Sequence, residues 1–310
     1  MNSILNTAGV RVVDPILTTH VQGYRHPGNV GHLLFPRVPV GVSGGQVLEF
    51  GKESFKLYNA RRAPGTDTKR IQFGYAGKPF ALKQDALEAA VPREWMRDAS
   101  KIPGIDLARR AVNVVQGAIE LGRENEKASI ATDAANYDAN HKLALAGGDK
   151  WSADTGKPVK DITDGKEAVR ATIGVRPNTL VLSPLAWNAA RENPSVIERF
   201  KFTTPGPITL EQFAKLVEIE TIVVGEAVYA DDAGDFHDVW GNAAVLAYVP
   251  RASEGMEQPS YGYTYTMEGH PSVEKPYWDD RAKSWVYGVT NEDAPLLTGM
   301  VAGFLFQDPA

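Results

Sequence analysis

The stretch LLFPRVPVGVSGGQVLEFGKESFKLYNARRAPGTDTKRIQFGYAGKPFAL, residues 33–82, alternates between apolar and polar positions as β-strands do. Its alternating apolar residues form two groups: Val38, Val40 and Val42, then Ile71, Phe73 and Tyr75. These residues are too sparse to build a core, and an isolated two-stranded ribbon is marginally stable in water. We therefore expect this ribbon to pack on the rest of the chain or on a neighbouring copy of it.

Two turns and a basic cluster mark the ribbon. Gly44-Gly45 is expected to turn the chain between the first two strands, and Pro64-Gly65 before the third. The basic residues near the second turn are Arg61, Arg62, Lys69 and Arg70. They predict contact with an acidic face of another subunit or with a phosphate, and a solvated loop explains them equally well. Together with Phe73 they are the candidate intersubunit contact residues.

The composition is that of a folded protein without cysteine chemistry. The 310 residues suffice for one large or two ordinary domains, and 43% of them are hydrophobic. The lack of cysteine excludes disulfides, thiolate nucleophiles and cysteine-based metal sites, and it suits a reducing cytoplasm. The net charge of −5 is opposite to that of proteins that bind nucleic acid by neutralising phosphates. The sequence contains neither a signal-peptide pattern nor an apolar run long enough to span a membrane.

The segments on either side of the ribbon differ in character. Residues 1–32 predict an extended N-terminal arm with one short helix, and residues 85–104 predict a linker of small and charged residues. Residues 105–132 carry apolar side chains at helical spacing, so we expect a helix of about 22 residues and about 33 Å, capped by Asp106. Its apolar face is expected to hold Leu107, Ala111, Val114, Val115 and Ala118. Its charged face is expected to hold Arg109, Arg110, Glu120, Arg123, Glu124, Glu126 and Lys127.

Residues 159–249 predict a compact α/β unit, because strand and helix patterns alternate with short connections. We expect a helix over 164–173 that Gly174 ends, and helices that begin after Ser183, Asn193 and Thr209, the last with a capping box. The expected strands are NTLVL, TIVVG and AAVLAYV. Residues 260–306 return to a β pattern, with alternating tyrosines at 261, 263 and 265 and a turn at 279–281.

No motif in the sequence occurs in the context that an enzymatic function would need. Gly41-Val42-Ser43-Gly44-Gly45 matches the G-x-S-x-G pattern of hydrolases, but that pattern needs a helix after it, and residues 46–50 continue as strand. The six histidines lack the spacing of a zinc site, and no phosphate-binding or dinucleotide-binding glycine motif is present. We therefore expect no catalytic residue, no metal and no cofactor. The alternating tyrosines suit sheet packing better than carbohydrate or base stacking, because no basic residues are interleaved with them.

The order of these segments resembles the major capsid proteins of tailed bacteriophages with the Hong Kong 97-type fold. The resemblance rests on several segments in order: VGHLLFPRVPV (30–40), FGKESFKLYNARRAPGTDTKRIQFGY (50–75), PGIDLARRAV (103–112), ATDAANYDANHKLALAGGDKWSAD (131–154), RPNTLVLSPLAWNAARENP (176–194), VGEAVY (224–229), VWGNAAVLAYVP (239–250) and PSYGYTYTMEG (259–269). Together they span most of the chain.

The resemblance implies an α+β chain with five parts. These are an N-terminal arm (1–32), an extended β-hairpin loop (33–90), a peripheral domain with a long spine helix (91–158), an α/β axial domain (159–249) and the closing β-strands of the peripheral domain (250–310). The extended loop would lie across a neighbouring subunit. The chain begins directly with the arm, so we expect no fused scaffolding domain, and we expect a shell without covalent crosslinks.

The function implied by the resemblance is that of a major capsid protein in the virion, assembled in the host cytoplasm. Copies would form the hexamers and pentamers of an icosahedral shell that encloses double-stranded DNA without sequence-specific binding. Separate scaffolding, portal and decoration proteins are the other expected partners, and no membrane is involved. Two alternatives remain, a bacterial nanocompartment shell and, in a different class, a serine hydrolase that uses Ser43.

Overall fold

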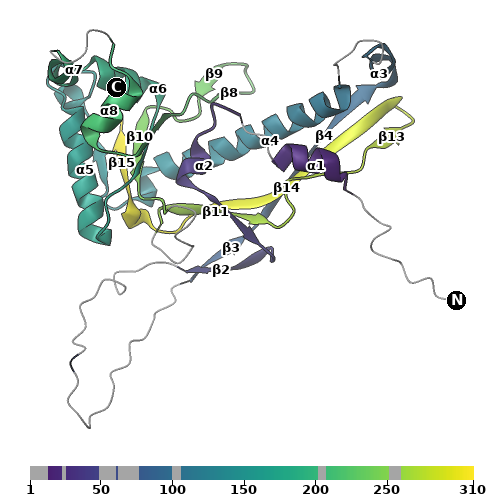
Figure 1. Cartoon of the computed structure of the whole chain (residues 1–310), viewed down its shortest axis with the longest axis horizontal. Coiled ribbons are helices and arrows are strands. Elements are labelled where there is room, and N and C mark those ends of the chain that lie inside the picture. Colours follow the sequence, from purple (N-terminus) through teal and green to yellow (C-terminus); the bar gives the residue numbers. More distant parts are fainter. Residues whose placement is uncertain are drawn as a thin grey trace.

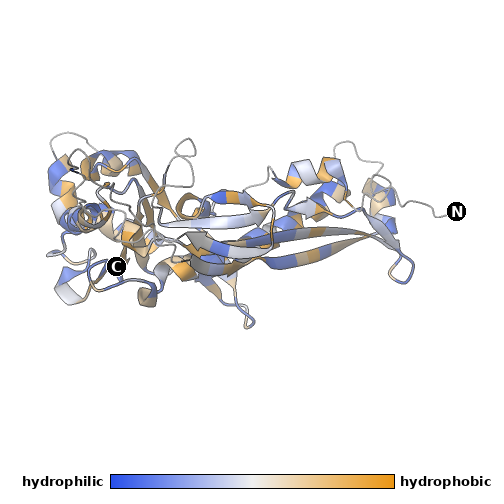
Figure 2. Cartoon of the chain, turned by 90° about the horizontal axis from the view of Figure 1, so that it is seen from below, coloured by the Kyte–Doolittle hydropathy of each residue, from blue (hydrophilic) through white to orange (hydrophobic). Residues whose placement is uncertain are grey.

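The computed structural model describes residues 13–22, 26–48, 61, 77–99, 106–201, 207–250 and 260–310. Two sheets lie toward opposite ends of an elongated molecule, and the long helix α4 (Leu107–Thr132) runs between them (Figure 1). Seen from below, the molecule is thin, and strands of the larger sheet extend along much of its length (Figure 2). None of the described helices is long and apolar enough to cross a membrane.

The five-stranded sheet has the order β5-β15-β10-β6-β7. Its strands are β5 (Lys142–Ala144), β15 (Gly303–Gln307), β10 (Ala243–Ala247), β6 (Thr179–Leu182) and β7 (Thr221–Val224). β10 runs antiparallel to both β15 and β6, while β6 and β7 are parallel. The three strands expected in the α/β unit are thus confirmed. The last strand, β15, lies in this sheet and not with the other closing strands, which is a correction to the expected grouping.

Four helices accompany this sheet: α5 (Pro158–Ile173), α6 (Pro184–Glu192), α7 (Pro194–Phe200) and α8 (Leu210–Val217). The expected caps are confirmed, because Ser183 Oγ accepts a hydrogen bond from Ala186 N and Thr209 forms a capping box with Gln212. α5 begins six residues earlier than expected, since Pro158 occupies its first turn, where the backbone N–H that proline lacks is not needed. Gly174 ends α5 at φ 73°, a conformation that suits glycine.

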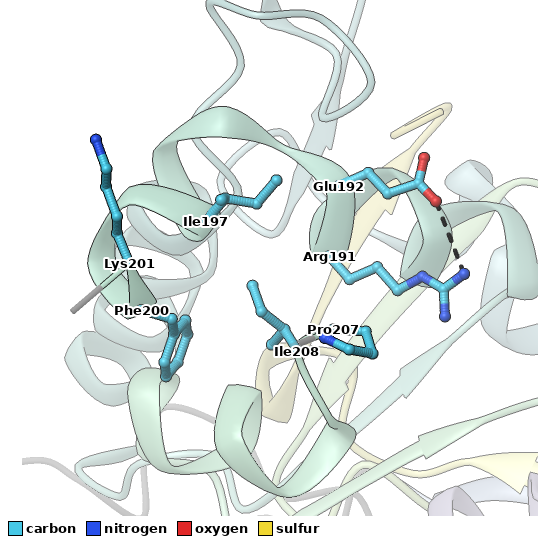
Figure 3. Close-up of a pocket in the computed structure, with 7 residues that line it drawn as sticks. All are labelled: Arg191, Glu192, Ile197, Phe200, Lys201, Pro207 and Ile208. Carbon is cyan, nitrogen blue, oxygen red and sulfur yellow. Dashed lines mark ion pairs between the residues drawn. The ribbon is translucent and has the colours of Figure 1, made fainter. Parts of the chain in front are cut away.

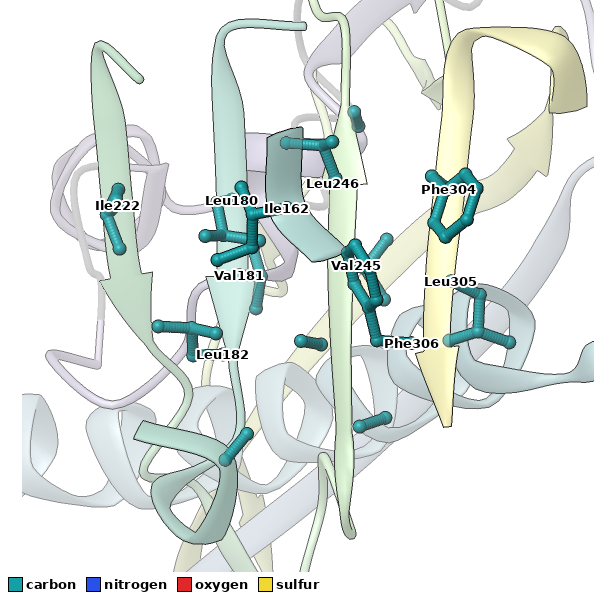
Figure 4. Close-up of a cluster of buried hydrophobic side chains, with 14 of the residues drawn as sticks. Ile162, Leu180, Val181, Leu182, Ile222, Val245, Leu246, Phe304, Leu305 and Phe306 are labelled. Atoms are coloured by element: carbon teal, nitrogen blue, oxygen red, sulfur yellow. The ribbon is translucent and has the colours of Figure 1, made fainter. Parts of the chain in front are cut away.

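The core of this end lies between the sheet and its helices (Figure 4). β10 is buried along its whole length, which explains its unbroken apolar sequence AAVLA. Leu180, Leu182 and Leu246 are fully buried, as is Ile162 on α5. At about 25 cal/mol for each Å² of apolar surface removed from water, such side chains contribute about 1.5–3 kcal/mol each. This end therefore has a core sufficient for its own stability.

The six-stranded sheet is built around the long strand β14 (Ser284–Leu297). The other strands are β1 (Arg37–Val40), β11 (Gly262–Met267), β12 (Ser272–Val273), β13 (Tyr277–Asp279) and β4 (Lys83–Pro92). β4 pairs with β14 in antiparallel register over ten residues and leads into α3 (Arg93–Ala99). The expected linker is therefore wrong over 85–99, while residues 100–104 lie outside the described residues. β4 exposes most of its side chains, so its sequence lacks the alternation that would have revealed a strand.

Helix α4 lies across the six-stranded sheet, and Asp106 caps it as expected by accepting a hydrogen bond from Arg109 N at 3.0 Å. It contains 26 residues, four more than expected. Ala111 and Val115 are buried as expected, whereas Val114 is 64% exposed. The charged face was assigned wrongly in its C-terminal half, because Arg123, Glu124 and Lys127 are buried. The two ends of α4 thus bury different kinds of side chain.

The ribbon is only partly as expected. β1 pairs in parallel with β11 of the same chain, so this part of the arm packs on the body. β2 (Gly44–Leu48) and β3 (Gly77–Ala81) form a separate antiparallel pair. Gly44 and Gly45 lie inside β2, and the chain bends before them, over 41–43, which corrects the expected turn. The ring of Phe80 in β3 stacks on Tyr265 of β11 with centroids 5.0 Å apart, which joins this pair to the larger sheet.

Smaller elements complete the described chain. The N-terminal segment holds α1 (Pro15–Gln22) and the single turn α2 (Gly31–Leu34), so a short helix in the arm is confirmed. The remaining elements are the hairpin strands β8 (Val228–Ala230) and β9 (Phe236–Asp238) and the short helices η2 (Ala134–Asn136), η3 (Gly147–Asp149) and η4 (Met300–Ala302). The turn expected at 279–281 joins β13 to β14, where Asp279 accepts hydrogen bonds from two backbone N–H groups.

Candidate functional site

The G-x-S-x-G segment has no hydrolase geometry. Ser43 is exposed in the bend over 41–43, and strand β2 follows it where a nucleophile elbow would place a helix. Within the described residues, no group of three His, Asp or Glu side chains is arranged to hold a metal ion. The hydrolase alternative therefore loses its structural basis.

Of the candidate contact residues, Arg61 alone falls within the described part of the chain, and it is exposed. Arg62, Lys69, Arg70 and Phe73 lie outside the described residues. Their assignment as intersubunit contacts stays a prediction. The strands that lead to and from this segment, β2 and β3, are paired side by side, with Leu48 opposite Gly77. The two residues that flank segment 49–76 therefore lie next to each other.

A buried ion network joins helix α4 to the six-stranded sheet. Arg123 forms ion pairs with Asp293 of β14 at 2.7 Å, Asp85 of β4 at 2.7 Å and Glu126 at 2.6 Å. The Arg123 side chain is 5% exposed and that of Asp293 is 1% exposed. Burial raises the pKa of Asp293 above its ordinary value, while the charge of Arg123 opposes that change. The network fixes α4 in one position on the sheet, since each partner is costly to bury alone.

Glu124 connects α4 to the N-terminal segment one residue further along. Its Oε1 accepts hydrogen bonds from the N–H groups of Val30 at 2.8 Å and Gly31 at 2.9 Å, and from Trp240 Nε1 at 2.9 Å. A Cβ atom on Gly31 would lie 2.8 Å from Glu124 Oε2, so the close approach requires glycine. One buried carboxylate thus holds three separate segments of the chain together.

The face of the larger sheet opposite α4 carries acidic side chains. Glu88 lies opposite Gly288, and Glu292 lies four register pairs away, opposite Gln84. These positions alternate with Ala89 and Val91, which pack with the cluster beneath α4, so they point to the other face. Glu274 approaches the same face, because its Oε1 accepts a hydrogen bond from Thr290 and its Oε2 would lie 3.3 Å from a Cβ on Gly288. This acidic sheet face is a candidate contact surface.

A shallow apolar depression lies at the outer end of the helical part, between α7 and the start of α8 (Figure 3). Ile197 and Phe200 of α7 face Ile208 across it, and the Arg191–Glu192 ion pair lies at its rim. Its volume is about 320 Å³, and Ile197 is 48% exposed. Apolar side chains line most of the depression, and its charged lining residues are Arg191, Glu192 and Lys201.

Sequence reasoning missed Arg123, Glu124 and Lys127 because it placed every charged residue of α4 in solvent. The spacing of apolar residues along α4 could have revealed their burial. The buried residues Val112, Val115 and Ile119 recur at three- and four-residue intervals, and the same progression continues to Arg123 and Lys127. Helical position, and not residue type alone, predicts which side chains face the sheet.

Comparison with known proteins identifies the fold and the family. The model of the family described as phage major capsid protein E matches residues 108–285. The major capsid protein of Burkholderia phage BcepMu is 36% identical over 300 residues, with 96% of each chain covered. A crystal structure of a phage-related protein from Bordetella bronchiseptica RB50 is 50% identical, with a TM-score of 0.85 over 96% of this chain and 98% of that one.

The capsid structure of cyanophage P-SCSP1u shares the fold at 10% identity, with a TM-score of 0.56 over 88% of this chain and 86% of that one. The Hong Kong 97-type fold is thereby confirmed, and so is the expectation of a structural protein and not an enzyme. The α/β end, the spine-like helix α4 and the sheet beneath it, together with the family match, show that the chain belongs to the phage major capsid protein E family and builds the virion shell.

Proposed function

We propose that copies of this chain assemble, in the host cytoplasm, into the hexamers and pentamers of an icosahedral shell that encloses double-stranded DNA. The single observation that carries the proposal is the pairing of strands β2 and β3, which brings the two ends of residues 49–76 together. A two-stranded pair of this kind gains stability when it packs on a second copy. Scaffolding, portal and decoration proteins remain the other proposed partners.

Within that shell, we assign the parts of the chain as the resemblance implies. The five-stranded sheet and α5–α8 form the axial domain around the capsomer centre, and the six-stranded sheet with α4 forms the peripheral domain. The membership of β15 in the first sheet supports one change, namely that the last strand belongs to the axial domain. Residues 1–32 remain the arm and residues 33–90 the extended loop.

The proposed contact places residues 49–76 of one copy on the acidic sheet face of its neighbour, defined by Glu88, Glu274 and Glu292. The segment carries six Lys or Arg residues, among them Arg61, Arg62, Lys69 and Arg70, against three acidic residues. The charges of the two surfaces are therefore complementary, which favours encounter and register more than affinity. Phe73 supplies apolar contact in the same segment.

The test removes residues 49–76 and joins Leu48 to Gly77 through an Asn-Gly turn. These two residues are paired across β2 and β3, so a two-residue turn closes the hairpin without strain on the body. We expect a soluble folded subunit that forms no shells by electron microscopy and sediments as small species. The matched control reverses charge alone, with Arg61, Arg62, Lys69 and Arg70 changed to Glu. Intact shells from the deletion variant would contradict the proposal.

The nanocompartment alternative is distinguished by the contents of the shell. Particles purified from infected or lysogenic cells are expected to contain DNA, and nuclease treatment after disruption should release nucleotides in quantity. Particles that hold a single enzyme and no DNA would favour the alternative. The match to a phage capsid family and to the BcepMu capsid protein favours the capsid.

A further inference from the structure

A polar pocket lies between the N-terminal segment and helix α4, apart from the sheet faces described above. Its volume is about 260 Å³. The lining residues from the N-terminal side include His26, Asn29, His32 and Arg37, and those from α4 are Glu120 and Lys127. Two cationic side chains and two imidazoles thus face one carboxylate.

Lys127 is the unusual member of this pocket. Its side chain is buried, with 3% of the residue exposed, and it lines the pocket wall. Within the described residues it makes no hydrogen bond and no ion pair within 4 Å. Burial lowers the pKa of Lys127, while the carboxylates of Glu120 and Glu124 oppose that change. An ammonium in the pocket wall without a direct partner is poorly solvated, so an anion bound in the pocket would stabilise its charge.

The acidic residues nearby are already engaged. Glu120 forms an ion pair with Arg37 at 2.8 Å and accepts a hydrogen bond from Gln116 at 3.0 Å. Glu124 accepts its hydrogen bonds from Val30, Gly31 and Trp240, so its charge is stabilised elsewhere. Both carboxylates stabilise the positive charge of Lys127 through space, but neither contacts it directly.

One imidazole adds a donor. His26 Nδ1 accepts a hydrogen bond from Gly28 N at 3.2 Å, which leaves the proton on Nε2 when the ring is neutral. From these contacts we infer that the pocket binds an oxyanion group, a phosphate ion or a carboxylate, with the Lys127 ammonium as its principal partner and Arg37 and His26 at the rim. The carboxylate source is an Asp or Glu side chain of a second copy in the shell.

The experiment measures inorganic phosphate binding to unassembled subunits by equilibrium dialysis at constant ionic strength in chloride. We expect saturable binding of one phosphate for each subunit. Lys127→Met keeps the length and apolar contacts of the side chain and should lower the affinity at least about tenfold, since a close charge contact is removed. Lys160→Met, which alters an exposed lysine of α5, should leave the affinity unchanged.

Arg37→Met gives a second variant in case Lys127→Met is poorly folded. It removes a cation from the rim and releases the charge of Glu120 into the pocket, so phosphate affinity should again fall. A wild-type subunit that binds no phosphate, or equal binding by wild type and Lys127→Met, would overturn the inference. Phosphate binding is measured on unassembled subunits, so its absence would overturn this inference and leave the proposed shell contacts untouched.

Assembled shells then identify the source of the anion. If phosphate binds shells and subunits equally, the site takes a free anion. If subunits bind phosphate and shells do not, a carboxylate of another copy fills the pocket after assembly. In that second case Lys127→Met should also weaken the shells toward dissociation, whereas Lys160→Met should not.

Discussion

In the described part of the chain, the five-stranded sheet lies in one large apolar cluster, whereas the six-stranded sheet buries a separate, smaller cluster beside a network of charged side chains. In the first, strands such as β10 are apolar throughout and helices cover them. In the second, Arg123, Asp293 and Lys127 occupy positions that would hold leucine in an ordinary core. The comparison separates a part stabilised by burial from a part positioned by specific polar contacts.

This difference affects how precisely each part of the chain is positioned. Burial of apolar surface is a non-directional interaction, whereas a buried ion network has few geometries in which every charge is satisfied. Helix α4 is therefore held on its sheet in a defined register. The stability changes below are expected for unassembled subunits, measured as the free energy of unfolding in urea.

The largest effect should come from Arg123→Met. The change leaves the buried carboxylate of Asp293 without its cation, and removal of one partner from such a pair costs about 3–5 kcal/mol. The double variant Arg123→Met with Asp293→Leu should recover most of that loss. Arg170→Met, at an exposed ion pair with Glu167 on α5, serves as control and should cost at most about 1 kcal/mol. If Arg123→Met loses less stability than Arg170→Met, the buried ion network does not contribute to the stability of the subunit.

Leu246→Ala tests the apolar end. The side chain is fully buried in β10, so its truncation should cost about 2–4 kcal/mol through lost burial and a residual cavity. Leu185→Ala on α6 is the control, because that residue is 48% exposed and its change should be nearly neutral. If both leucine variants lose the same amount of free energy of unfolding, this end is not stabilised mainly by its buried apolar side chains.

Gly31→Ala examines the junction between the two parts. The added methyl group would lie 2.8 Å from Glu124 Oε2 and 3.0 Å from Lys127 Cδ, and such overpacking costs about 1–3 kcal/mol. Gly122→Ala is the matched control, since nothing lies within 4 Å of its added Cβ and alanine favours the helix. If both glycines behave alike, the contact with Glu124 does not need glycine.

The smallest effect concerns pH. Burial raises the pKa of Tyr265 from 10.0 to about 12. Because the folded state disfavours the phenolate, this contribution to stability is complete below pH 10 and is lost as the pH rises from about 10 to about 12. Tyr265→Phe should reduce the loss of stability over that range, by less than about 1 kcal/mol after solvent screening. Identical pH profiles would indicate that the stacked ring is more open to water than described.

Local sequence signals determined much of the part of this protein that contains the five-stranded sheet. Helices after Ser183 and Asn193 follow from a capping side chain before proline, and β10 follows from five consecutive apolar residues, because these effects act within a few residues. The cap at Asp106 was predictable for the same reason. The order of segments also sufficed to indicate the capsid fold.

Only the tertiary structure decided which strands meet and which charges are buried. β4 is a strand because β14 supplies its hydrogen bonds, and β15 lies in the five-stranded sheet because β5 and β10 flank it there. Arg123, Glu124 and Lys127 look like a solvated face in sequence, yet their environment comes from residues as distant as Val30 and Asp293. Pairing and burial depend on contacts between remote segments, which no local pattern encodes.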